Sequence, residues 1–215
     1  MVRVAAGVFG PGHLGELTQV VPFELVDAVL EETGRVRVQH RLRKLPLRVG
    51  VYFLLAMCLF PEVGYQLVWA KMTASLAGRP AVRPTAKALR DLRRRVGDAP
   101  MRALFEVVSG PLAWPVTPGV RFGRYRTVSF DGCSSLKVPD TDQNRVWLDR
   151  LAHGGYPQLE LMTLVETGTR ALVGAVFGPT AVGETEYAQR LLHLLTPDML
   201  VLWDKGFDGN DFWPR

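Results

Sequence analysis

Cysteine is scarce in this chain of 215 residues, which contains only Cys58 and Cys133. Neither has another Cys or a His at metal-ligand spacing. The sequence therefore disfavours a disulfide framework and a zinc finger, and it favours a reducing, cytoplasmic setting.

Long apolar runs are also missing. The most apolar window, Val49 to Phe60, has 12 residues and is followed by Pro61, whereas a helix that crosses a bilayer needs about 20. The first residues lack the apolar segment of a signal peptide. We therefore predict that the window forms a buried core helix and that the protein has no membrane partner.

Charge is unevenly distributed along the chain. The formal net charge is +5, but residues 1–115 carry 16 Lys and Arg against 9 Asp and Glu, whereas residues 116–215 carry 10 against 12. This asymmetry predicts a polyanion-binding module joined to a module with its own carboxylate chemistry. An ordinary basic surface remains the alternative.

The first half of the chain has the apolar periodicity of helices, interrupted by Pro and Gly. The predicted helical segments are Glu16–Thr33 with a restart at Pro22, Val49–Phe60, Tyr65–Leu76, the stretch from Pro84 to Val96, and Met101–Val108. A Pro-containing connection, Trp114 to Gly119, predicts a domain boundary. We expect an all-helical, basic domain over residues 1–115 and a second domain over 120–215.

Basic residues gather at two places in the first half. One is a stripe at spacings i, i+3 and i+7 on the fourth helical segment: Lys87, Arg90 and Arg94, flanked by Arg93. The other leads into the apolar window: Arg41, Arg43, Lys44 and Arg48. Either set could bind DNA phosphates with a steep salt dependence, or form a solvated face without a specific partner. We favour DNA contact, because the stripe lies in the positive half of the chain.

The second half changes to strand patterns. Tyr125–Asp131 alternates in polarity and predicts a half-buried strand that ends at Asp131, where Gly132 lets the chain turn away. An inserted loop over 132–155 with a short helix at Gln143–Leu151 follows. The remaining predicted elements are a hairpin of Leu159–Glu166 and Ala171–Phe177, a helix over Glu184–Leu195, and a strand over Met199–Trp203, buried on both faces, that presents Asp204.

This order of elements predicts a mixed sheet, so the predicted fold class is α+β. A right-handed crossover makes the last strand the parallel neighbour of the first. Asp131 and Asp204 then meet at adjacent strand ends. Two carboxylates there can share divalent metal ions about 4 Å apart, as in enzymes of phosphoryl transfer. Mg²⁺ (or Mn²⁺) suits such ligands.

Several motifs resemble DDE transposases of the insertion-element-four family. Those of the second half resemble the RNase H-like catalytic core: Ser129-Phe130-Asp131-Gly132, Val138-Pro139-Asp140, the segment from Gly155-Tyr156-Pro157 to Val165-Glu166, and Trp203-Asp204-Lys205-Gly206-Phe207. Those of the first half are similar to the helical N-terminal domain: Pro22-Phe23-Glu24-Leu25-Val26, Arg48-Val49-Gly50-Val51-Tyr52 and Phe60-Pro61-Glu62-Val63-Gly64-Tyr65.

The resemblance implies three catalytic carboxylates. By position, Asp131 is the first and Asp204 the second, and both are implied metal ligands. The third is a Glu on a helix well beyond the second Asp, and no Glu follows Asp204 in this sequence. We therefore expect an incomplete RNase H-like sheet, the front piece of a transposase, without strand transfer of its own.

The implied partners are DNA at element ends and a second copy or a full-length transposase. The implied location is the cytoplasm, associated with the nucleoid. An alternative is a non-catalytic DNA-binding protein that occupies element ends or inhibits the full-length enzyme. A further one is that the incomplete sheet does not fold stably.

Overall fold

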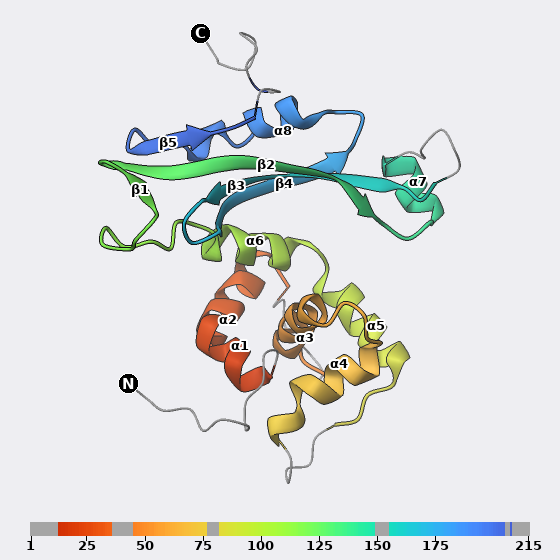
Figure 1. The fold of residues 1–215 in the computed structure, drawn as a ribbon. Coiled ribbons are helices and arrows are strands. Elements are labelled where there is room, and N and C mark those ends of the chain that lie inside the picture. Colours follow the sequence, from red (N-terminus) through yellow and green to blue (C-terminus); the bar gives the residue numbers. More distant parts are fainter. Residues whose placement is uncertain (1–12, 36–44, 77–81, 149–154, 205–206, 208–215) are drawn as a thin grey trace. The chain divides into compact units, whose positions relative to one another are not determined.

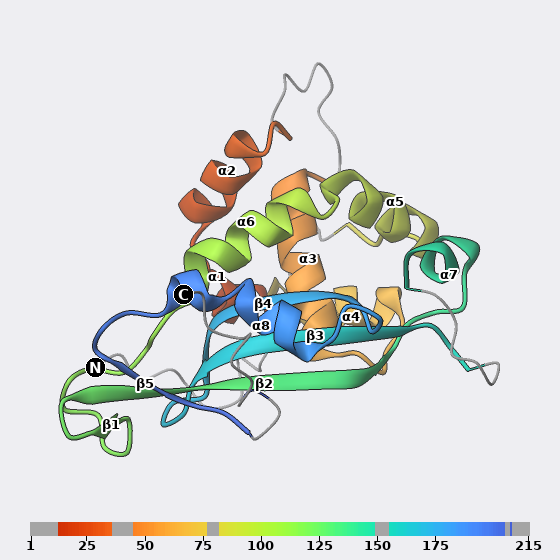
Figure 2. The same ribbon diagram turned by 90° about the horizontal axis from the view of Figure 1, so that it is seen from above.

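A computed structural model describes residues 13–35, 45–76, 82–148, 155–204 and 207 (Figure 1). The chain forms two compact units, residues 1–107 and residues 108–215, and each is described by itself below. Helices make up the first unit, and a sheet with helices makes up the second (Figure 2). The predicted α+β class is confirmed.

The helices of unit 1 follow the apolar periodicity of the sequence. They are α1 (Leu14–Val20), α2 (Phe23–Glu32), α3 (Leu47–Leu59), α4 (Tyr65–Met72), a 3₁₀ turn (Ala74–Leu76), α5 (Ala86–Val96) and α6 (Ala99–Val108). Pro22 directly precedes α2, as predicted, because its fixed φ suits a helix start and its missing N–H leaves no donor unpaired there. Among the described residues, no helix has both the length and the apolarity to span a bilayer.

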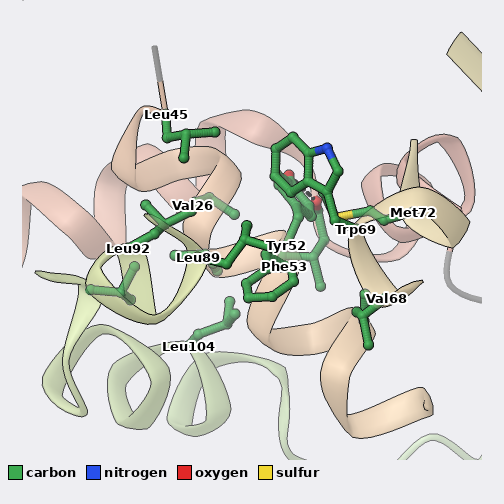
Figure 3. Close-up of a cluster of buried hydrophobic side chains, with 14 of the residues drawn as sticks. Val26, Leu45, Tyr52, Phe53, Val68, Trp69, Met72, Leu89, Leu92 and Leu104 are labelled. Carbon is green, nitrogen blue, oxygen red and sulfur yellow. Dashed lines mark hydrogen bonds between the residues drawn. The ribbon is translucent and has the colours of Figure 1, made fainter. Parts of the chain in front are cut away.

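The core of unit 1 is built on α3 (Figure 3). Tyr52 and Phe53 are fully buried, and the Tyr52 hydroxyl donates a hydrogen bond of 2.6 Å to the Val21 carbonyl oxygen. Gly50 permits close approach of α5, because a Cβ at this position would lie 2.6 Å from Cγ2 of Val96. The apolar window of the sequence is therefore a core helix, as predicted.

Unit 2 contains one mixed sheet. Its elements are β1 (Arg121–Phe122), β2 (Tyr125–Lys137), α7 (Asp142–Leu148), β3 (Gln158–Glu166), β4 (Ala171–Pro179), α8 (Glu184–Gln189), a 3₁₀ turn (Leu192–Leu194) and β5 (Met199–Leu202). The order β1-β2-β3-β4 is antiparallel throughout, and β5 pairs in parallel with β2 (Figure 2). The predicted hairpin and the predicted parallel neighbours are both confirmed.

Glycines on the strands let the segment of α8 and the following 3₁₀ turn pack onto the sheet. A Cβ at Gly178 would overlap the hydroxyl of buried Tyr187, and one at Gly174 would overlap the side chain of Leu194. The Tyr187 hydroxyl donates to the Pro179 carbonyl oxygen at 2.9 Å. Close packing thus depends on backbone surface without side chains at these positions.

The prediction that the first strand ends at Asp131 was wrong. β2 continues to Lys137, because β3 pairs with it beyond Gly132, with a register shift between Cys133 and Leu136. Gly132 has a packing role instead of a turn role, since a Cβ there would lie 2.6 Å from Oε1 of Glu184. The predicted inserted loop is accordingly shorter, and its helix is α7.

The prediction that the last strand is buried on both faces was also wrong. Met199, Leu200 and Val201 are half-buried and Leu202 is exposed. Within the described residues β5 has one strand partner, β2. An apolar run without alternation therefore did not indicate full burial here.

A buried carboxylate ties the segment before β1 to the end of β3. Glu166 is completely buried and accepts hydrogen bonds from the backbone N–H groups of Leu112 (3.2 Å) and Ala113 (2.9 Å). It also accepts from the Arg126 guanidinium and the Thr169 hydroxyl. Burial opposes ionisation, but these hydrogen bonds outweigh it and lower the pKa of Glu166. Glu166 is therefore a buried carboxylate with a structural role, and both of its oxygens accept hydrogen bonds.

Candidate functional site

The parallel pairing of β2 and β5 relates Asp131 to Asp204. The last paired residues are Ser129 of β2 and Leu202 of β5. Asp131 lies two residues after Ser129, and Asp204 lies two residues after Leu202. The two aspartates therefore occupy equivalent positions along the two neighbouring segments. Both are exposed. The predicted proximity of the two chain segments is therefore confirmed, although β2 continues past its aspartate while β5 has already ended.

An aromatic contact fastens the segment after β5 to β2. The rings of Phe130 and Phe207 stack with their centroids 6.2 Å apart and their planes at 27°, and Phe207 is buried. The Phe207 N–H donates to the Asp204 carbonyl oxygen at 3.3 Å. The chain after Asp204 thus turns back onto the strand residue that precedes Asp131.

The other acidic groups of this region lie on the α8 side of the sheet. Val128 and Phe130 belong to the core beneath α8, and side chains alternate along a strand, so Asp131 faces away from α8. Glu160 is buried. Burial raises the pKa of Glu160, and the nearby Glu184 carboxylate adds to this effect. These two glutamates do not add ligands to the aspartate pair.

Asp131 and Asp204 offer carboxylate oxygens, which are the ligands that Mg²⁺ and Mn²⁺ prefer in proteins. Mg²⁺ commonly keeps several waters and takes substrate phosphate oxygens beside one or two carboxylates. The pair therefore fits such an ion as a partial ligand set. Among the described residues, no group of three or more His, Cys, Asp or Glu side chains could hold a metal ion.

The predicted basic stripe is an exposed face of α5. Lys87, Arg90 and Arg94 are exposed, while the opposite face of the helix packs into the core through Leu89, Leu92 and Val96. Asp91 approaches Arg94 at 4.0 Å, a separation at which an exposed pair contributes little. The stripe is therefore available to an anionic partner.

Two other arginines of α5 are engaged within unit 1. Arg93, a predicted DNA contact, donates from Nη1 to the Tyr65 hydroxyl at 2.8 Å. Arg95 donates from Nη2 to the Leu45 carbonyl oxygen at 3.1 Å. Arg93 is thus less available to DNA than the three residues of the stripe.

Arg48 also has a partner inside unit 1. Its Nε donates to Oδ1 of Asp27 at 2.6 Å and its Nη2 to Oδ2, and its guanidinium lies 5.4 Å from the centroid of the Phe23 ring. Contact with DNA would compete with this bidentate ion pair. Arg41, Arg43 and Lys44 lie outside the described residues.

The sequence analysis missed a basic and aromatic hairpin in unit 2. Arg121 and Phe122 of β1 pair with Arg126 and Tyr125 of β2, and Arg124 lies in the turn between them. The signal was the run Arg-Phe-Gly-Arg-Tyr-Arg over residues 121–126. The net charge of residues 116–215 is slightly negative, so the charge count over this half did not indicate a basic element within it.

Comparison with known proteins bears on the first half of the chain. Residues 11–106 match the family model of the insertion element 4 transposase N-terminal domain. Searches among curated proteins and among solved structures gave no match. The family match supports a transposase of the insertion-element-four type. It does not extend to the residues that carry Asp131 and Asp204.

Proposed function

We propose that this chain belongs to a DDE-type transposase that acts on insertion-element DNA ends by metal-dependent phosphoryl transfer. The observation that carries the proposal is the register of β2 and β5, which gives Asp131 and Asp204 equivalent positions. The strand order β4-β3-β2-β5, with α8 before β5, agrees with the RNase H-like core that the resemblance implies. The family match of residues 11–106 supports the same reading independently.

In this proposal Asp131 and Asp204 hold Mg²⁺ or Mn²⁺ against the scissile phosphate. A bound ion of this kind activates a water or a 3′-hydroxyl and stabilises the leaving oxygen. The two side chains would hold such an ion just beyond the last paired residues of β2 and β5. The third carboxylate of the family lies, by resemblance, further along the chain than Asp204.

DNA is held, in the proposal, through the exposed stripe of α5. Lys87, Arg90 and Arg94 would bind phosphates without reading bases. Their common face covers roughly 10 Å of helix at about 1.5 Å per residue, a length suited to successive phosphates. With DNA as its partner, the protein would be located on the DNA of the nucleoid.

Metal binding can be tested without relying on catalysis. Titration with Mn²⁺, followed by the loss of the free-ion electron paramagnetic resonance signal, should show binding by the native chain. Asp131→Asn and Asp204→Asn should each weaken it at least 10-fold. Asp142→Asn on α7 is the matched control, because this carboxylate is exposed in the same unit, and it should leave binding unchanged. Equal binding by all four proteins would refute the metal site.

The second candidate is a non-catalytic DNA-binding protein that occupies element ends or inhibits full-length transposase. The exposed basic stripe of α5 favours it, because such a face can bind phosphates without a metal site. Incubation of supercoiled plasmid carrying element ends with Mn²⁺ separates the two. Nicking that Asp131→Ala abolishes supports catalysis. Gel shifts that survive this substitution, without nicking, and that disappear when Lys87, Arg90 and Arg94 become Gln, support binding alone.

A further inference from the structure

The hairpin of β1 and β2, residues 121–126, has no part in the carboxylate site. It is held by the pairs Arg121–Arg126 and Phe122–Tyr125, and Gly123 takes a left-handed φ of 58° in its turn. Figure 1 shows β1 beside the first residues of β2. A two-residue turn of this kind fixes the directions of the side chains on either side of it.

Two of its guanidinium groups are oriented by neighbours that carry no charge. Arg121 donates from Nη1 to the Arg124 carbonyl oxygen at 2.7 Å. Arg124 donates from Nη2 to the Tyr125 hydroxyl at 2.7 Å and lies 4.8 Å from the centroid of its ring. None of the ion pairs between described residues involves Arg121 or Arg124, whereas Arg126 pairs with buried Glu166.

Besides Glu166, the acidic residue Asp198 lies near the hairpin. Asp198 has a lowered pKa, first because the Thr196 hydroxyl donates to its carboxylate at 2.5 Å and further because Arg126 and Arg121 are close. This carboxylate offsets part of the charge of Arg121. Arg124 is exposed at the tip of the hairpin.

The hairpin also carries an exposed aromatic ring, on the face that Phe122 shares with its pair partner Tyr125. The side chain of Phe122 is 72% exposed, although it lies in a strand pair. A single exposed apolar residue is common and proves nothing alone. An exposed ring and the guanidinium of Arg124 on one face, with that of Arg121 on the other, suit a nucleic-acid strand, since phosphates bind cations and bases or sugars contact aromatic rings.

We infer that the hairpin over residues 121–126 is a second DNA-contacting element, in which Arg121 and Arg124 bind backbone phosphates and Phe122 packs on a nucleotide. The inference rests on the proposed function, because that function supplies DNA as the partner. Asp131 lies five positions after Arg126 on β2, which corresponds to roughly 17 Å at about 3.4 Å per residue. The hairpin and the carboxylate site would therefore contact DNA at points roughly 17 Å apart along β2.

The salt dependence of binding tests the phosphate contacts. The affinity for a fluorescein-labelled duplex should be measured by fluorescence anisotropy at NaCl concentrations from about 50 to about 200 mM. Each lost phosphate contact reduces the slope of log K against log salt by about 0.9. The double variant Arg121→Gln, Arg124→Gln should therefore lower the slope by about 1.8.

Arg190→Gln is the matched control. Arg190 also lies over a tyrosine ring, at 4.9 Å from the centroid of Tyr187, but it forms an ion pair with Glu186. Its replacement should leave the slope unchanged. If the native chain binds no DNA, the proposed function fails and the inference with it. If it binds with the same slope in the double variant, the inference alone is wrong.

Photocrosslinking tests the position of Phe122. In Phe122→p-benzoylphenylalanine the new side chain should crosslink to bound duplex under near-ultraviolet light. The same replacement at Phe177, which is also exposed (58%) but lies on β4, should not. Crosslinking from position 177 alone, or from neither position while DNA is bound, would overturn the inference.

Discussion

The ring of Phe207 stacks on the ring of Phe130, with 6.2 Å between their centroids. This contact joins residues that are far apart in the sequence and fixes the chain after Asp204 against the strand that carries Asp131. It makes the position of the second aspartate depend on apolar packing on the α8 side of the sheet. The proposed metal binding would thereby depend on the packing around Phe207.

Phe207→Ala should remove the contact that holds the segment of Asp204 against the strand of Asp131. Loss of a buried ring costs about 3–5 kcal/mol, and Asp204 loses its fixed position. We expect a lower urea midpoint and weaker Mn²⁺ binding than in the native chain. Phe177→Ala, which removes an exposed ring, should change stability by less than about 1 kcal/mol. Unchanged Mn²⁺ affinity in Phe207→Ala would show that the contact does not position Asp204.

Gly178→Ala should destabilise unit 2 by about 1–3 kcal/mol, because the new methyl group would overlap the hydroxyl of buried Tyr187 and force a shift in a packed core. Urea unfolding measures the effect. Adding Tyr187→Phe should recover part of the loss by removing the overlapping atom. Gly64→Ala is the control, since nothing lies within 4 Å of its Cβ position. A neutral Gly178→Ala would mean that α8 can move away from β4 without cost.

Glu166→Gln should cost at least about 2 kcal/mol at neutral pH. The substitution removes the charge that compensates Arg126, and an unpaired buried charge is strongly unfavourable. Chemical unfolding at pH 7 is the measurement. Glu106→Gln, which breaks an exposed pair with Arg102, should cost less than about 0.5 kcal/mol.

The same carboxylate predicts a dependence of stability on pH. The pKa of Glu166 is lowered in the folded state, so its contribution is present above the unfolded value of about 4.3. It is lost as the pH falls through the folded value. The native chain should lose more stability than Glu166→Gln when acidified below about pH 4.3. Parallel curves for the two proteins would assign acid sensitivity to other groups.

Tyr52→Phe should destabilise unit 1 by about 1–3 kcal/mol, since the buried Val21 carbonyl oxygen loses its donor. Burial raises the pKa of the Tyr52 hydroxyl to about 12. The unfolded chain ionises near pH 10, so the native chain should lose stability as the pH rises from there toward 12. Urea unfolding across this range should show a shallower decline in Tyr52→Phe. Tyr65→Phe, which loses only an exposed bond to Arg93, serves as the control.

The helices of unit 1 and the strand order of unit 2 could be predicted because their signals are local. Pro22 and the apolar spacing around α5 define helix starts and faces without reference to distant residues. The adjacency of β2 and β5 followed from a general rule of crossover handedness. The extent of β2 beyond Gly132 could not be predicted, because the partner that prolongs it, β3, begins 26 residues later at Gln158.

The sequence by itself determined the helical front, the mixed sheet and the parallel pairing of the strands that precede Asp131 and Asp204, since periodicity and connection rules act along the chain. The tertiary structure decided which polar groups are already occupied. Arg48 and Arg93 have partners in unit 1, while Arg124 at the hairpin tip remains exposed. The physical reason is that hydrogen bonds and ion pairs form between residues that only folding brings together, and no local pattern records them.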